Sequence, residues 1–326
     1  MLDHPLLRRW LDRGLSRLER ATVDRIRLIP RRPPLLVVGP PRCGTTALFL
    51  SLVNDLRLSF IPNVSKRHPR APFLYALLAS LRHRYQPTLA NRYGIVDQPL
   101  GPSDGWDVFL RWLPNAYASG PAGPELAELR TLVRLFEVLL GGPLCVRNNV
   151  NSLRVPLLDA VFEGAIFVGI TRDYREAAPS LAEAYRVHAT PPDAWWSAGP
   201  PDYDPACFAT PLEKAVFQIL GVEAILRRDL ARLPAERALL VDYAAFCADP
   251  DAVVDWVAGS YARTGFELRR PAPARLRAQR STRRGAPEGA LARALEEHGA
   301  AFLRGAHLRS EDVLSAPVRG LVEAAA

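Results

Sequence analysis

An apolar run, a glycine-containing turn and a helical pattern follow one another early in the chain. Leu35–Val38 contains only large aliphatic residues, which favours a strand buried on both faces of a parallel sheet. The turn after it has the pattern Gly39-x4-Gly44, and Thr45-Thr46 begins the helical pattern. Glycines at this spacing let successive backbone N–H groups point toward one centre, where the helix N-terminus adds positive potential. The segment therefore predicts a phosphate-binding loop at the carboxyl end of a buried strand.

Further apolar runs alternate with helical patterns along the rest of the chain. Three runs are short and continuous enough for buried strands: Leu144–Arg147, Ala165–Ile170 and Ala238–Val241. The helical patterns cover residues 2–28, Thr45–Leu56, 125–140, Leu153–Phe162, Tyr174–Arg186, Leu212–Leu233 and Pro250–Thr264. This alternation predicts an α/β fold in which a P-loop-type central parallel sheet is flanked by helices on both faces.

The 326 residues are expected to form one large domain behind a helical extension. Residues 1–32 are expected to be a basic N-terminal helix, and residues 33–326 a single α/β domain. Two stretches near 60–125 and 190–210 are rich in proline and aromatic residues. Long segments of this kind within an α/β domain are often functional, so both are expected to be irregular substrate loops.

The formal net charge is +8, from 42 basic and 34 acidic residues. Only two of the basic residues are lysine, a skew that resembles a coding bias and weakens a nucleic-acid interpretation of the charge. The excess is concentrated in residues 1–32, with nine arginines against four acids, and in residues 263–284, with eight arginines against one acid. Such clusters attract anions, including the phosphates of a small cofactor or of lipids.

The sequence predicts no transmembrane helix, no metal site and no disulfide framework. The uncharged apolar runs are far shorter than the roughly 20 residues of a transmembrane helix, and the N-terminus lacks the apolar stretch of a secretory signal. The four cysteines are widely spaced: Cys43, Cys145, Cys207 and Cys247. We therefore expect reduced thiols and a cytoplasmic protein, with residues 2–28 as a candidate peripheral membrane contact.

The phosphate loop also resembles a known family. Residues Pro41–Thr46, PRCGTT, resemble the 5′-phosphosulfate loop of sulfotransferases that use 3′-phosphoadenosine 5′-phosphosulfate (PAPS). Cys43 stands where the family usually has serine, which removes a hydroxyl but keeps the backbone amide. The NTPase loop instead has lysine where this chain has Thr45. The resemblance implies that the 5′-phosphosulfate end is bound by Arg42, Cys43, Gly44, Thr45 and Thr46.

Two further segments fit the same family. Arg172 comes two residues after the third predicted strand, and Ser180 follows eight residues later, the family spacing of the two side chains that hold the 3′-phosphate. Arg280–Gly285 resembles the loop that closes over that phosphate, which adds Arg283, Arg284 and Gly285 to the implied cofactor-binding residues. The resemblance covers about residues 33–290 and is greatest to the bacterial and carbohydrate-type branch.

The resemblance implies an activity. A sulfuryl group would pass from PAPS to a hydroxyl or amine of a sugar, lipid or secondary metabolite by in-line attack, leaving 3′-phosphoadenosine 5′-phosphate. No metal is required, because Arg42 can neutralise charge on the bridging oxygen. A base must take the acceptor's proton; Asp104 is the first candidate and His68 the second, ahead of Asp97 and Asp107.

The acceptor and the oligomeric state are not specified by the sequence. Trp195, Trp196 and Tyr203 either line an acceptor pocket or pack on the core as a lid, and Lys214 is expected to be an exposed charge. The acceptor is expected to be a small molecule, a glycan or a lipid, and nucleic acid is not an expected partner.

Two other classes fit parts of the sequence. Ala238–Asp242 has four apolar residues followed by aspartate, like the Walker B strand of a P-loop kinase or NTPase, although Thr45 occupies the position of the required lysine. The basic clusters would also suit a non-catalytic nucleotide-binding or polyanion-binding protein.

Overall fold

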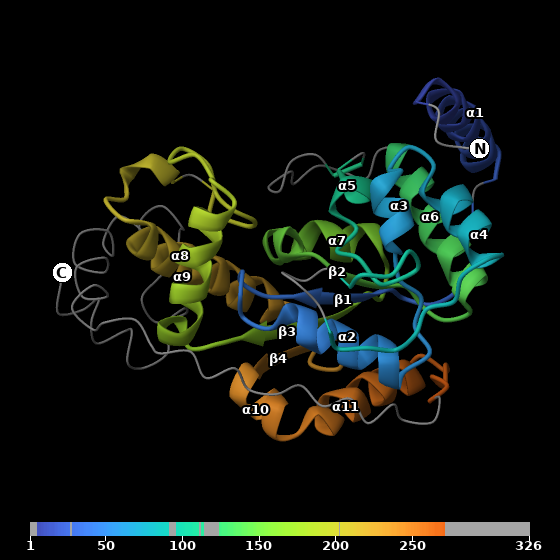
Figure 1. The fold of residues 1–326 in the computed structure, drawn as a ribbon. Helices are drawn as coiled ribbons and strands as arrows, with labels where there is room; N and C mark the ends of the chain where they lie inside the picture. Colours follow the sequence, from blue (N-terminus) through green and yellow to red (C-terminus); the bar gives the residue numbers. More distant parts are fainter. Residues whose placement is uncertain are drawn as a thin grey trace.

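A computed structural model describes residues 5–26, 28–90, 96–110, 112–113, 124–201 and 203–270. The centre is a sheet of four strands (Figure 1). Its members are β1 (Leu35–Val38), β2 (Cys145–Arg147), β3 (Ile166–Thr171) and β4 (Ala238–Asp242). All pairings are parallel, in the order β2-β1-β3-β4. The four predicted strands and the parallel sheet are therefore confirmed, with bounds shifted by one residue at most.

The two faces of the sheet carry different helices, because successive side chains of a strand point to opposite sides. Leu36 and Val38 of β1 are buried with α6 (Pro124–Leu140) and α7 (Val155–Val161). Leu35 and Val37 are buried on the other face. The helices there are α2 (Thr45–Asp55), α10 (Tyr243–Ala248) and α11 (Pro250–Arg263), which lie below the sheet in Figure 1.

Two long helices follow β3 in the chain. They are α8 (Tyr174–Val187) and α9 (Pro211–Leu230), which pack against each other through a buried cluster of small and aromatic side chains. Thr210 and Glu213 form a reciprocal capping box at the start of α9. The aspartate before α8, Asp173, accepts a hydrogen bond from the backbone of Arg175 and caps that helix.

Residues 60–125 are more helical than expected. They contain α3 (Asn63–Arg67), α4 (Pro72–Ser80) and α5 (Trp106–Phe109). The expectation of an irregular segment was wrong here, because helices of four to nine residues owe their stability to packing rather than to a periodic pattern. The short helix expected at Leu153–Phe162 is confirmed as α7, and a 3₁₀ turn, η1 (Asn149–Leu153), precedes it.

The N-terminal helix is α1 (Pro5–Arg25), close to the predicted range. Its buried Glu19 accepts hydrogen bonds from the backbone N–H groups of Phe73 and Leu74, at 3.2 and 2.8 Å, in the first turn of α4. A carboxylate at a helix N-terminus satisfies otherwise unpaired N–H groups and complements the helix dipole. Of the helices described, none has the length and apolarity to cross a bilayer.

The segment 190–210 is held down by α9. Lys214, expected to be exposed, is buried, and its ammonium donates hydrogen bonds to the carbonyls of Pro192 and Ala194, at 2.5 and 2.8 Å. That expectation was wrong, because backbone carbonyls from another segment replace the water around the charge. The ring centroids of Tyr203 and Phe217 lie 4.2 Å apart, and Trp195 stacks on the same phenylalanine at 6.4 Å. In the described structure these aromatic side chains pack on the α8–α9 cluster, the second of the two roles considered for them.

Candidate functional site

The loop between β1 and α2 turns through two residues with left-handed backbone. Arg42 has φ 66° and Gly44 has φ 101°, and Gly44 is the N-cap of α2. Side chains of η1 hold the loop in place by hydrogen bonds to its backbone. The N–H of Gly39 donates to Ser152 Oγ at 2.8 Å, and the Asn149 amide donates to the carbonyls of Gly39 and Pro40 at 2.8 and 3.1 Å. The first N–H groups of α2 thereby stand in a fixed position at the carboxyl end of β1.

Both glycines of the loop are required by close neighbours. A Cβ on Gly39 would lie 2.4 Å from the carbonyl oxygen of Ile170 in β3. A Cβ on Gly44 would lie 2.3 Å from Cδ2 of Tyr243, the first residue of α10. The loop is therefore a tight cradle pressed between the ends of neighbouring strands, in the crevice where open α/β sheets bind ligands.

The loop meets the other predicted anion-binding element. The Arg42 Nε donates a hydrogen bond to Ser180 Oγ at 2.9 Å, across 138 positions of sequence. Arg172, directly after β3, pairs with Glu176 at 3.0 Å, and its guanidinium lies 4.6 Å from the Tyr243 ring centroid. The structure thus brings Arg42, Arg172 and Ser180 to the same edge of the sheet.

Two more charged side chains lie at this edge of the sheet, Arg147 at the end of β2 and Asp104 two residues before α5. Arg147, the last residue of β2, donates to Thr46 Oγ1 at 2.9 Å, and its guanidinium lies 3.9 Å from the carboxylate of Asp104. Lys66 pairs with Asp104 at 3.0 Å. Burial lowers the pKa of Arg147, the Asp104 carboxylate raises it, and the Arg42 cation lowers it further. Asp104 is therefore linked to the phosphate loop through a single side chain.

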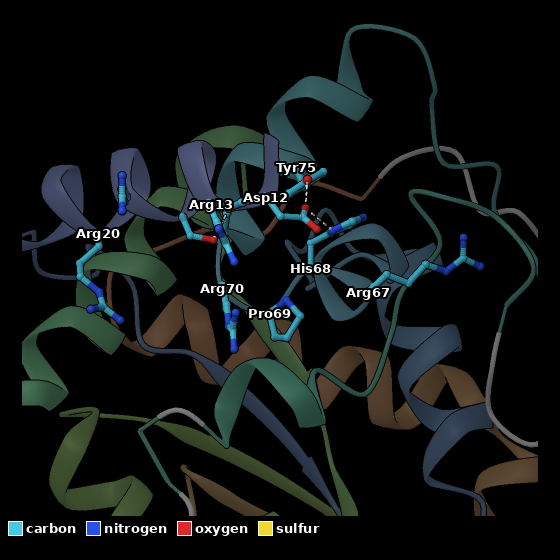
Figure 2. Close-up of a pocket in the computed structure, with 11 residues that line it drawn as sticks. Asp12, Arg13, Arg20, Arg67, His68, Pro69, Arg70 and Tyr75 are labelled. Carbon is cyan, nitrogen blue, oxygen red and sulfur yellow. Dashed lines mark hydrogen bonds and ion pairs between the residues drawn. The ribbon is translucent and has the colours of Figure 1, made fainter. Parts of the chain in front are cut away.

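His68 lies elsewhere. Its Nδ1 is 3.1 Å from the carboxylate of Asp12 on α1, and its ring stacks on Tyr75 with centroids 3.6 Å apart. In Figure 2 these three side chains lie together at one end of the cavity beneath α1. The described contacts of His68 are with this group, whereas those of Asp104 are with the residues around the phosphate loop.

Cys43 is fully buried between the loop and the α8–α9 cluster. Burial raises the pKa of its thiol, so the side chain is a neutral packing group. Its backbone N–H donates to the carbonyl of Pro40 at 3.3 Å and closes the turn of the loop. Arg283, Arg284 and Gly285 lie outside the described residues.

Three residues of the site were not among the predicted site residues. Asn149 and Ser152 support the loop, and Arg147 links it to Asp104. Their position directly at or after the end of the strand beside β1 is the signal that could have identified them. Asp242, the Walker-B-like aspartate, accepts hydrogen bonds from the N–H groups of Ala244 and Ala245 and caps α10.

Comparison with known proteins gives a family and a fold. The family model described as "Sulfotransferase family" matches residues 33–259. Among solved structures, sulfotransferase STF9 from Mycobacterium avium is 16% identical, with a TM-score of 0.52 over 88% of this chain and 81% of that chain. Sulfotransferase STF1 from Mycobacterium tuberculosis H37Rv is also 16% identical, with a TM-score of 0.48 over 78% of this chain and 76% of that chain. No curated protein matches the chain.

Proposed function

Because the chain belongs to the sulfotransferase family, we propose that it transfers a sulfuryl group from PAPS to a hydroxyl or amine of a small-molecule, glycan or lipid acceptor. One observation carries the choice of donor. The phosphate loop and the helix after Arg172 meet through the 2.9 Å hydrogen bond from Arg42 to Ser180. A ligand with phosphate-like groups at two places can engage both elements, and PAPS is such a ligand.

The residues present fit this donor. Because Gly39 and Gly44 carry no Cβ, the loop backbone packs directly on Ile170 and Tyr243, and the start of α2 is held beside Arg42. Backbone N–H groups at a helix N-terminus beside a guanidinium suit an anion. We assign the 5′-phosphosulfate to this loop, with Thr45 and Thr46 at the start of α2. When bound, PAPS supplies the activated sulfuryl group and a bisphosphate leaving group.

The 3′-phosphate belongs with Arg172 and Ser180 in this proposal. A guanidinium is planar and always charged, so it can form paired hydrogen bonds with two phosphate oxygens. Glu176 pairs with Arg172 at 3.0 Å and holds its side chain at the end of β3. Tyr243 packs beside the same guanidinium. These two contacts fix the orientation of the Arg172 side chain in the ligand-free protein.

The chain's own acid–base chemistry is assigned to Asp104. Its carboxylate lies beside Lys66 and Arg147, and the latter donates to Thr46 of the loop. A carboxylate oxygen is a hydrogen-bond acceptor and can take the proton of an acceptor hydroxyl or ammonium. His68 is the second candidate for this role, and its contacts place it beneath α1.

The donor assignment is tested by titrating the protein with 3′-phosphoadenosine 5′-phosphate, read as a thermal shift, with Mg·ATP and AMP in parallel. We expect a preference for the bisphosphate. Arg172→Ala should weaken binding about 10- to 100-fold, because a charged hydrogen bond contributes about 1.5–3 kcal/mol. Ser180→Ala should weaken it about fivefold. Arg186→Ala, on the exposed side of the same helix, is the matched control.

Two results would contradict the proposal. The first is the absence of a shift with the bisphosphate, and the second is a larger shift with Mg·ATP, which would favour a kinase. The base is tested separately by screening acceptors with labelled PAPS. Asp104→Asn should bind the bisphosphate normally and lose turnover, whereas turnover lost only in His68→Gln would transfer the role to the histidine.

A further inference from the structure

Helix α1 lies against α4 and α6, at the outer edge of the molecule in Figure 1. Two of its acids attach it. Glu19 accepts from the first turn of α4, and Asp12 contacts both His68 and Tyr75. These contacts engage the carboxylates of the described part of α1 that face the protein, and they fix the orientation of the helix.

A cavity of about 700 Å³ lies between α1 and the segment that follows α3. Its lining includes five arginines: Arg13, Arg17 and Arg20 from α1, and Arg67 and Arg70 from the facing segment. Figure 2 shows Arg13 and Arg20 extending from α1 toward the segment that carries Pro69 and Arg70. All five side chains are exposed, and no described carboxylate lies within ion-pair distance of any of them.

The cavity therefore concentrates positive charge. Asp12 is the one acidic residue in its described lining, and it is already bonded to His68 and Tyr75. A hollow lined by charge of one sign raises the local concentration of counter-ions. Guanidinium groups match the geometry of phosphate oxygens. The volume lies within the range of about 300–1,000 Å³ typical of ligand pockets, so it can accept a phosphate-bearing group.

The exposed side of α1 also carries apolar side chains. Trp10 is 71% exposed, Leu18 56% and Leu11 43%. At 3.6 residues per turn these three fall within one sector of about 100°, directly beside the sector of Arg17 and Arg13. Tryptophan and leucine beside arginines on one helix form the pattern of a helix that lies in a membrane interface.

We propose that this α1 surface, formed by Trp10, Leu11, Leu18 and the arginine cavity, docks the protein on a bilayer that contains anionic lipids. The headgroup phosphates enter the cavity between α1 and Arg70, and the three apolar side chains rest at the acyl boundary. The occupant follows from the pairing of the two features, since a soluble anion would use the cavity but leave the exposed tryptophan and leucines in water. The proposal does not depend on the reaction that the enzyme catalyses.

The test is co-sedimentation of the full chain with vesicles of phosphatidylcholine alone and with about 30 mol% phosphatidylglycerol. We expect binding to the anionic vesicles only. The triple substitution Arg13→Gln, Arg17→Gln and Arg20→Gln should weaken it about 100-fold, at roughly fivefold for each charge removed. Trp10→Ala should weaken binding with all arginines in place. Arg186→Gln together with Arg263→Gln, on α8 and α11, is the control that removes exposed charge elsewhere.

A second arm separates lipid from soluble anion. Inositol hexakisphosphate is titrated against the same proteins by calorimetry. Binding of this compound together with no sedimentation on anionic vesicles would overturn the membrane proposal, as would vesicle binding that is equal in the triple variant and the parent. Unchanged melting temperatures and unchanged bisphosphate binding establish that the variants are folded and that the donor site is intact, so a negative result is attributable to the surface.

Discussion

Replacing Gly44 by alanine should disturb both the backbone of the phosphate loop and the packing beside it. The residue has φ 101°, where an L-residue pays about 1–2 kcal/mol. The new Cβ would also lie 2.3 Å from Cδ2 and 2.6 Å from Cε2 of Tyr243, whose side chain is buried beside Arg172. Overpacking of this kind costs about 1–3 kcal/mol. The two effects sum to about 2–5 kcal/mol of unfolding free energy.

Urea unfolding with two matched glycines separates these effects. Gly265 has φ 76° and no atom within 4 Å of an added Cβ, so Gly265→Ala pays the backbone cost alone. Gly259 lies inside α11 with open space around it, so Gly259→Ala should stabilise the protein by up to about 1 kcal/mol. Bisphosphate affinity should fall only in Gly44→Ala, because only that change moves the loop and the ring beside Arg172.

The double variant Gly44→Ala, Tyr243→Ala provides the decisive comparison. Removing the ring removes the overlap, so the alanine at position 44 should cost about 1–3 kcal/mol less in that background. If Gly44→Ala destabilises no more than Gly265→Ala, and the double variant shows no coupling, then the Tyr243 side chain moves aside at no cost. That result would refute the predicted overlap.

Three other outcomes are expected. Lys214→Met should lose about 1–3 kcal/mol in urea unfolding and expose residues 190–201 to proteolysis, because two carbonyls lose their donor; equal protease resistance would show that the segment holds without it. Cys207 is exposed and should react with iodoacetamide in the native state, whereas Cys43 and Cys145 should react only after unfolding; native labelling of Cys43, seen by peptide mass, would contradict its burial. Burial raises the pKa of Glu223 above 4.5, so wild type should lose stability relative to Glu223→Gln as pH rises from 4.5 through the folded pKa; a constant difference across that range would refute this.

The elements predictable from the sequence are those whose signal is local. The run Leu35–Val38 is continuous because both faces of β1 are covered, and the glycine turn follows from the loop's need for backbone without a Cβ. By contrast, α3 and α5 have five and four residues and depend on packing with one another, which no periodic pattern records. The expectation that Lys214 is exposed was wrong for the same reason, since the carbonyls that accept its hydrogen bonds lie some twenty residues away in the chain.

The residues of the candidate site also differ in how far the sequence could assign them. The family resemblance assigned Arg172 and Ser180, eight residues apart, to the 3′-phosphate, and the structure places Ser180 against Arg42 of the loop. The choice between Asp104 and His68 could not be made from the sequence, because both lie in the same insertion near basic residues. In the structure, the Asp104 carboxylate lies beside Arg147 of β2, which donates to Thr46, whereas His68 contacts Asp12 of α1.

The charges at the sheet edge explain why a phosphate-rich ligand suits this site. Arg147 is buried at the end of β2, and the Arg42 cation lowers its pKa further, so the folded protein bears the cost of two cations in a partly desolvated space. Asp104 offsets part of that cost, 3.9 Å away. Anionic groups on the loop would add favourable interactions with both guanidinium groups. The arginines brought together by the loop and by β2 therefore support the proposed phosphate ligand independently of the glycine pattern, because a turn can need glycines without a ligand, whereas two neighbouring guanidinium groups attract anions.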